Sequence, residues 1–280
     1  MGKIYLILPY FGIFPTYFQL YLDSLSINTS ILTVLILSDI LTESYNLPKN
    51  AVVSYITIQE VKERVIYFIK NCYNKVVDKQ DILKTNYKLC DFRPIYFSIF
   101  ADKLACLDLS CNDYVGWGDC DLIYGNISSF LDLENNTYSF IGIHGHFTAF
   151  RYTHELISLY QKIENLDECL LDPKYVGTDE NHLRKIIISM IRDGSHKEFP
   201  VRELFCDVVP GRMMVASSAK NRIISHLIFD YDGKKLTCKT EEDDYKEVFY
   251  AHLQKRKMTV NFEKHNGKFL IKENSFNLIP

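Results

Sequence analysis

Several features that mark common classes of protein are absent from this sequence of 280 residues. No apolar run reaches the roughly 20 residues that a membrane-spanning helix requires. None of the eight cysteines forms a Cys-x-x-Cys pair, the spacing of many zinc and redox sites. A net charge of −3 gives no basic excess for binding nucleic acid. No GxxxxGK[ST] phosphate loop is present, which disfavours a nucleotidyltransferase or phosphohydrolase that would use one.

The cysteines and the N-terminus both favour a cytoplasmic protein. Several cysteines lie in apolar runs, where a reduced thiol behaves as a small hydrophobic group. The apolar N-terminus carries one basic residue and is interrupted by Pro9, Gly12 and Pro15, unlike a signal peptide. We therefore expect a cytoplasmic location and leave open a peripheral contact with the inner membrane.

Strand and helix patterns alternate along the first part of the chain. Short apolar runs at 3–8, 33–37 and 52–55 predict buried strands, and residues 17–25 and 58–71 predict helices. This alternation is typical of an α/β fold with a mostly parallel central sheet, in which ligands bind at the carboxyl ends of the strands. The composition, 47% hydrophobic and 24% charged, is ordinary for a globular protein.

The rest of the chain continues the pattern and then changes. Helices are expected at 95–107, 151–163 and 181–192, the last with Thr178 as its N-cap, and strands from Val115 and at 140–143. The tail is more polar and sheet-like. With no internal repeat and no low-complexity linker, we expect one domain over residues 1–280 with a C-terminal extension.

Two acids one residue apart, Asp119 and Asp121, end an apolar run between Gly118 and Gly125. On an extended chain such residues point to the same side, where two carboxylates repel each other unless a cation lies between them. Mg²⁺ and Mn²⁺ commonly bridge carboxylates and phosphates. The alternative is a loop with two solvated acids, but the apolar flanks favour the metal site.

A third metal ligand is expected near the end of the chain, and we choose His252. It precedes Lys255, Arg256 and Lys257, cations that can hold diphosphate oxygens. A single histidine is more often structural and a basic run is more often solvated surface. Combined with the upstream acids, these residues predict a metal–diphosphate site.

Five short motifs follow one another along almost the whole chain. They are PYFG (9–12), LSD (37–39), DFRP (91–94), GDCD (118–121) and HLQKRKM (252–258). In this order they resemble a glycosyltransferase with the GT-A fold. More narrowly, the sequence is similar to bacterial galactosyltransferase-like proteins of polysaccharide and O-antigen clusters, including galactofuranosyltransferase modules.

The resemblance implies a nucleotide-sugar-binding half over residues 1–130 and, over residues 131–280, an acceptor half with a metal- and phosphate-binding tail. It also implies roles for particular residues on the donor side. Asp39 would contact the uracil or ribose of a UDP-sugar, beside Pro9 and Tyr10 of the first motif. Asp91 and Arg93 would line the donor site, although a local salt bridge before a helix is an equal alternative. The remaining implied roles repeat the metal–diphosphate site: Asp119, Asp121 and His252 on Mn²⁺ or Mg²⁺, and Lys255 and Arg256 on the phosphates.

The acceptor side is implied by acids and histidines. Asp179 and Glu180 resemble the acidic pair that supplies the catalytic base of inverting enzymes of this type, with Asp179 preferred. Both acids also suit a helix N-terminus without any catalytic role. His144 and His146 are expected near the acceptor, and a metal role for them is a less favoured alternative.

The sequence thus predicts a metal-dependent, inverting glycosyltransferase. It would move galactose or galactofuranose from a UDP-sugar to a glycan or lipid-linked glycan of a bacterial surface, with no nucleic-acid partner. Its 19 Tyr and 18 Phe offer flat faces for sugars and nucleobases, although they also fill cores. Two alternatives stay open: a non-catalytic sugar- or nucleotide-binding module, and a metal-dependent nucleotidyltransferase.

Overall fold

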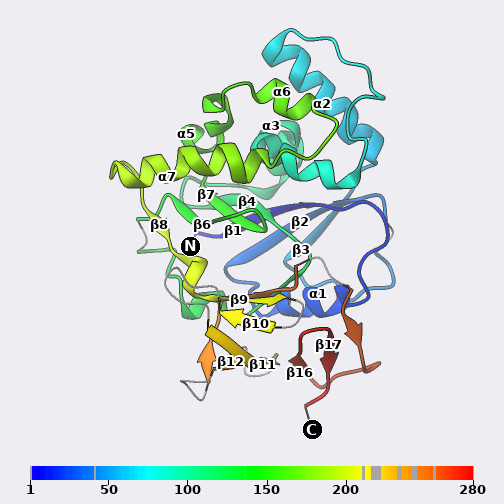
Figure 1. Ribbon diagram of the computed structural model, residues 1–280, viewed down its shortest axis with the longest axis vertical. Helices are drawn as coiled ribbons and strands as arrows, with labels where there is room; N and C mark the ends of the chain where they lie inside the picture. The colour runs from blue at the N-terminus through cyan, green and yellow to red at the C-terminus, as the bar shows by residue number, and fades with distance from the viewer. Residues whose placement is uncertain are drawn as a thin grey trace.

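The computed structural model describes residues 2–40, 42–135, 137–209, 212–215, 222–231, 235–240, 245–254 and 257–279. It is a mixed α/β structure with two sheets. In Figure 1 the helices α2, α3, α5, α6 and α7 cover one face of the first sheet, and the second sheet lies on the opposite side. Among these residues, no helix has the length and apolar character needed to cross a membrane.

The first sheet is largely parallel. Its order is β3 (Ala51–Tyr55), β2 (Leu32–Ser38), β1 (Ile4–Pro9), β4 (Tyr114–Gly118), β7 (Phe147–Arg151), β6 (Phe140–His144) and β8 (Glu198–Phe199). The strands β3, β2, β1 and β4 run parallel, and β7 is antiparallel to both of its neighbours. The predicted strands are confirmed here: the apolar runs of β1 and β2 are largely buried on both faces of this sheet, whereas β3, at its edge, is partly exposed.

Alternate residues of the first sheet serve two hydrophobic cores. Leu6 and Leu8 of β1 face α1 (Phe18–Ser26) and the second sheet. Ile7, between them, faces the helical layer that contains α2 (Ile58–Tyr73). This alternation is the two-residue period of a strand. The other helices and helical turns are α3 (Tyr96–Ile99), α4 (Ala101–Leu104), α5 (His154–Ile157), α6 (Leu166–Leu171), α7 (Arg184–Arg192), η1 (Asn86–Ile95), η2 (Ala105–Leu107), η3 (Ile127–Ser129), η4 (Leu159–Lys162), η5 (Thr178–Leu183) and η6 (Val201–Glu203).

Two predicted helices are wrong as single elements. The segment 95–107 is divided at Phe100, whose φ of −119° and ψ of 23° fall outside the helical range. The segment 151–163 begins as the end of β7, and its helix starts only after Thr153, whose side chain accepts a hydrogen bond from the backbone N–H of Leu156. Apolar spacing predicted helical segments but not where they break.

The second sheet is mostly antiparallel and confirms the sheet-like tail. Its order is β15 (Thr259–Val260), β17 (Ser275–Asn277), β16 (Lys268–Ile271), β11 (Arg222–Asp230), β10 (Arg212–Val215), β9 (Phe205–Val209), β14 (Tyr250–His252) and β5 (Leu122–Tyr124), with β12 (Lys235–Thr240) beside β11 and β13 (Lys246–Glu247) beside β12. Because β5 comes from the middle of the chain, this sheet ties the tail to the segment that carries the two acids.

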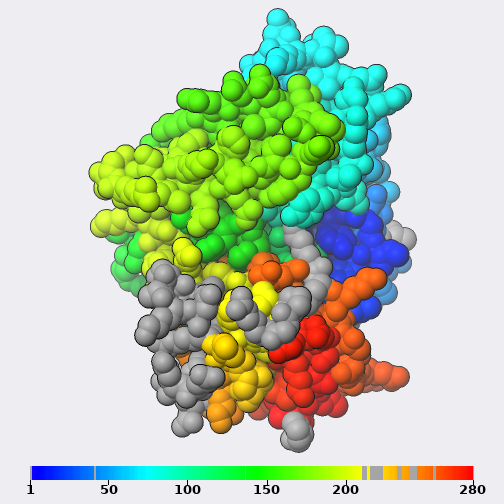
Figure 2. All heavy atoms as spheres, viewed as in Figure 1, coloured from blue at the N-terminus to red at the C-terminus, as the bar shows by residue number. Residues whose placement is uncertain are grey.

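The N-terminal segment and the C-terminal strands lie side by side. Figure 2 shows them, blue and orange to red, below the green and cyan helices. The Thr16 hydroxyl donates to the carbonyl of Met258 (3.2 Å), and the rings of Tyr17 and Phe276 are 5.6 Å apart. The tail therefore closes over the loop that follows β1.

Candidate functional site

The two acids lie where the two sheets meet. Asp119 follows β4 of the first sheet, and its backbone N–H donates to the carbonyl of His146 (3.0 Å). Asp121 precedes β5 of the second sheet, and its carbonyl accepts from the N–H of Leu253 (2.8 Å). These backbone contacts fix the short connection between the sheets at both ends.

Strand register brings His252 to Asp121. β14 pairs antiparallel with β5, which places His252 opposite Leu122, and parallel with β9, which places it beside Asp207. The Nε2 atom of His252 lies 3.8 Å from Oδ2 of Asp121, and Nδ1 lies 2.9 Å from Oδ1 of Asp207. The structure thus brings together the predicted pair Asp121 and His252.

Asp207 was missed by the sequence reasoning. Its carboxylate holds the Nδ1 side of His252 and also accepts from the Gln254 side chain (3.0 Å). Burial lowers the pKa of His252, but the hydrogen bond to Asp207 and the charges of Asp121 and Asp207 outweigh it and raise that pKa. One signal was available, because an acid inside the apolar strand FCDVV is unusual.

The expected histidine pair divides between two environments. The His146 ring stacks on His252, with centroids 3.9 Å apart, and its Nε2 lies 2.9 Å from the hydroxyl of Tyr250. His144 stacks behind His146 at 5.3 Å and is partly buried, and this burial lowers its pKa to about 4 and keeps its imidazole neutral. Only His146 is close to His252 and to the smaller cavity described below.

Arg93 joins two of the predicted acids. Its guanidinium donates to Oδ1 of Asp119 (2.5 Å) and to Oδ2 of Asp179 (2.7 Å). Burial raises the pKa of Asp179 to about 6, even though Arg93 acts in the opposite direction. Arg93 therefore links Asp119, a predicted metal ligand, to Asp179.

Two cavities meet at Arg93 and Asp119. The larger, about 720 Å³, is lined mainly by apolar and aromatic residues of the loop after β1, by η1 and by the acid segment. The smaller, about 220 Å³, contains His146, Glu180 and His252. Both share four lining residues: Tyr87, Cys90, Arg93 and Asp119.

Several predicted residues line these cavities and others do not. Pro9, Tyr10 and Asp121 line the larger one. Asp39 follows the neighbouring strand β2 but is not among the described residues that line either cavity. Lys255 and Arg256 lie outside the described residues, whereas Lys257 of the same basic run lines the larger cavity.

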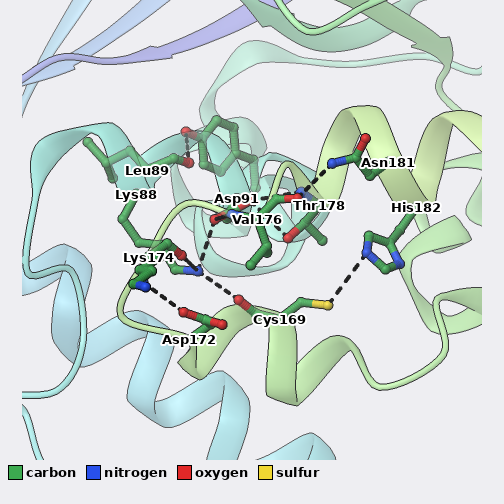
Figure 3. A network of polar contacts seen from close by, with 11 residues as sticks. Lys88, Leu89, Asp91, Cys169, Asp172, Lys174, Val176, Thr178, Asn181 and His182 are labelled. Carbon is green, nitrogen blue, oxygen red and sulfur yellow. Dashed lines mark hydrogen bonds and ion pairs between the residues drawn. The ribbon is translucent and has the colours of Figure 1, made fainter.

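Asp91 has a different position from the one expected at a donor site. Its side chain is fully buried, and its carboxylate accepts from the backbone N–H groups of Val176 (3.0 Å) and Thr178 (2.7 Å) and pairs with Lys88 (2.9 Å) (Figure 3). The Thr178 hydroxyl also donates to Asp91 (3.0 Å). Thr178 is consequently not the expected N-cap: it lies inside the π-helical turn η5, after Gly177 with a φ of 71°.

The two acids of the expected catalytic pair lie in different environments. Asp179 is buried and ion-paired to Arg93, whereas Glu180 is exposed and lines the smaller cavity. A Cβ added to Gly145 would lie 2.4 Å from Oε1 of Glu180, so this glycine leaves room for the carboxylate. Glu180 is the acid that can meet a ligand in the smaller cavity.

The Asp121–His252 pair fits a divalent cation whose coordination a ligand completes. Two atoms 3.8 Å apart can both contact one ion, because Mg²⁺–oxygen and metal–imidazole distances are about 2.1 Å. A carboxylate on the other ring nitrogen, here Asp207, is the usual outer partner of a metal-bound histidine. Within the described ranges, no group of three or more His, Cys, Asp or Glu residues is placed to hold an ion. Protein groups here would thus supply part of the coordination, as is common for Mg²⁺ on phosphates.

These features define an α/β protein with a two-part cleft at the junction of its sheets. The chain belongs to a protein family of unknown function, DUF6625, which matches residues 6–279. No curated protein and no solved structure matches the chain.

Proposed function

We propose that this protein is a metal-dependent glycosyltransferase of the GT-A type. It would transfer a sugar from a UDP-sugar, with galactose and galactofuranose as first candidates, to a hydroxyl of a bacterial surface glycan. The observation that carries the proposal is the Asp121–His252 pair, backed by Asp207, beside the point where the two cavities meet.

The larger cavity supports binding of the nucleotide part of the donor. Its volume of about 720 Å³ lies within the roughly 300–1,000 Å³ typical of small-molecule sites. It opens at the carboxyl ends of β1 and β4, the usual ligand side of a parallel sheet. Tyr10, Tyr87 and Trp117 contribute aromatic surface for a base or sugar, and Lys257 supplies a cation for phosphate oxygens.

The smaller cavity supports binding of the acceptor. A cation on Asp121 and His252 would offset the charge of the departing diphosphate. Glu180 would take the proton of the acceptor hydroxyl, as a base within the cavity can. Arg93, between the two cavities, would add positive charge near the bond that breaks. A base placed opposite the leaving group gives inversion at the sugar carbon.

The proposal includes a cellular location and the form of the acceptor. We place the activity in the cytoplasm, with a free or lipid-linked glycan as acceptor. The lipid-linked form would add a peripheral contact with the inner face of the membrane.

The test begins with binding. UDP and Mn²⁺ together should raise the melting temperature in a concentration-dependent manner, as expected for a ligand of the native state, and Asp121→Asn should abolish the Mn²⁺-dependent part. The control Asp81→Asn changes an exposed acid that pairs with Lys84 and should respond like wild type. Absence of any Mn²⁺-dependent stabilisation by UDP in the wild-type protein would refute the proposal.

Turnover separates an enzyme from a binding module. A panel of UDP-sugars is incubated with candidate glycan acceptors, and released UDP and glycosylated product are measured. Binding of UDP with Mn²⁺ but no product from any donor would favour the non-catalytic module. Release of pyrophosphate from UTP and a sugar phosphate would favour the nucleotidyltransferase.

A further inference from the structure

We infer that Lys88 and Asp91 are positioning residues that hold residues 172–178 and thereby place Tyr175 and Glu180 at the smaller cavity. The inference deepens the proposed function, because it rests on Glu180 acting there. It concerns a buried polar cluster that touches neither cavity among the described residues.

Lys88 and Asp91 bind a segment that has no regular secondary structure. Residues 172–177 form neither helix nor strand, so their backbone polar groups need partners elsewhere. Asp91 supplies acceptors for the N–H groups of Val176 and Thr178. Lys88 donates to the carbonyls of Cys169 (2.7 Å) and Lys174 (2.9 Å) (Figure 3). Two side chains thus fix this segment and the end of α6 before it.

The ion pair itself lies deep in the protein. Lys88 is 1% exposed and Asp91 is 0% exposed. A buried ion pair is commonly no more stabilising than apolar side chains of similar volume, because both charges lose their hydration. What apolar side chains cannot do is bind the backbone groups of residues 174–178. The chemistry of the pair therefore fits placement of this segment better than stability alone.

The geometry of η1 couples the cluster to the cavities. A 3₁₀-helix has three residues per turn, so residues three apart share a face. Tyr87, Cys90 and Arg93 share one face and line both cavities. Lys88 and Asp91 share the adjacent face and hold the 172–178 segment. The single element η1 thus supplies residues that line both cavities and residues that hold the 172–178 segment.

The held segment carries cavity residues. The Tyr175 ring meets Tyr87 of η1 edge to face, with centroids 4.6 Å apart, and its hydroxyl lies 3.3 Å from Oε2 of Glu180. The Asn181 side chain donates to the carbonyl of Val176 (2.7 Å). If Asp91 lost its contacts with Val176 and Thr178, the ring of Tyr175 and the carboxylate of Glu180 would lose their common support.

The experiment compares Asp91→Asn with Asp81→Asn. The second change removes the acid of another Lys/Asp pair spaced by three residues, Lys84 and Asp81, which is exposed. In Asp91→Asn, amide hydrogen exchange over residues 174–181 should accelerate about tenfold or more while β1 and β4 keep their protection. UDP–Mn²⁺ affinity should stay within about twofold, whereas kcat for transfer should fall about 100-fold, as for a misplaced reacting group. Asp81→Asn should match wild type in all three measurements.

A double variant separates placement from stability. Lys88→Met with Asp91→Leu removes both charges and keeps apolar bulk, so it should fold even if a single variant does not. We expect it to recover part of the thermal stability lost in Asp91→Asn, because no charge is left unpaired. Fast exchange over 174–181 and low kcat should remain, because the backbone groups still lack their partners. Recovery of kcat, unchanged exchange, or acceleration spread evenly over the chain would overturn the inference. Failure of wild-type protein to bind UDP would instead refute the proposed function. The exchange measurement would still show whether Lys88 and Asp91 hold residues 172–178.

Discussion

The larger cavity is built mostly from neighbouring pieces of the first half of the chain, whereas the smaller cavity joins distant ones. The larger takes most of its wall from residues 7–17, 86–96 and 117–121. The smaller combines η1 with Gly145 and His146, residues 175–180 and residues 252–254. Parallel strands bring their carboxyl ends to one edge by topology alone. The smaller cavity also depends on strand register and on the buried Lys88–Asp91 pair that holds residues 172–178. Changes in distant residues should therefore affect the smaller cavity more than the larger one.

The strongest test removes Arg93, one of the four residues that line both cavities. Arg93→Met leaves the buried carboxylate of Asp179 without its arginine, which should lower the free energy of unfolding by about 3–5 kcal/mol. The control is Arg64→Met, whose guanidinium pairs with the exposed Asp102 and should cost no more than about 1 kcal/mol. Urea denaturation measures both. Equal costs for the two variants would show that Arg93 does not join the cavities energetically.

The second test uses pH to titrate Asp179, the ion-pair partner of Arg93. Since the pKa of Asp179 is raised to about 6, the native state binds this proton more tightly than the unfolded chain. Its stabilising contribution is complete below the ordinary pKa near 4 and is lost as pH rises through about 6. Asp179→Asn, which cannot ionise, should therefore gain about 3 kcal/mol relative to wild type between pH 3.5 and pH 8. A stability difference that stays constant over this range would contradict the assignment.

The third test concerns Asp207, which holds His252 at the smaller cavity. Asp207→Asn keeps the size of the side chain but weakens its hold on Nδ1 of His252, so Mn²⁺ affinity in the presence of UDP should fall about 10–100-fold. UDP affinity without metal should not change, since Asp207 is not among the described residues lining the larger cavity. Titration calorimetry measures both affinities. Asp230→Asn, in the same sheet and paired with the exposed Lys268, is the matched control, and an equal loss of Mn²⁺ affinity there would exclude a specific role for Asp207.

The contrast between features set by local sequence and features set by distant contacts also explains how much of the structure the sequence could predict. The strands β1 and β2 were predictable because continuous apolar runs suit a sheet buried on both faces. The edge strand β3 is partly exposed, and its short apolar run fitted the alternation of strands and helices. His252 was predicted to join Asp119 and Asp121 because a basic run follows it in the sequence, and strand register supplies its contact with Asp121.

Other parts of the site could not be predicted because they depend on tertiary contacts. Asp207 reaches His252 only through the parallel pairing of β9 with β14, which links residues 45 positions apart. Asp91 and Arg93 are two residues apart, yet one grips the 172–178 segment and the other lines the cavities, since η1 turns every three residues. A motif fixes residue types and spacing, and the local helix type then decides which of them face the ligand.

The smallest effect is expected at Gly145, which lines the smaller cavity without a side chain. A Cβ at Gly145 would meet the exposed Glu180 side chain at 2.4 Å, and that flexible carboxylate can move away. Gly145→Ala should therefore change the free energy of unfolding by less than about 1 kcal/mol and leave UDP–Mn²⁺ affinity unchanged. Transfer should still slow about fivefold to tenfold, because a displaced base loses its alignment with the acceptor hydroxyl. Gly194→Ala is the control, since nothing lies within 4 Å of its added Cβ, although its φ of 79° makes alanine strained there. Gly194→Ala should lower stability without changing kcat. If Gly145→Ala instead lowered stability and left kcat unchanged, the smaller cavity would have a purely structural role.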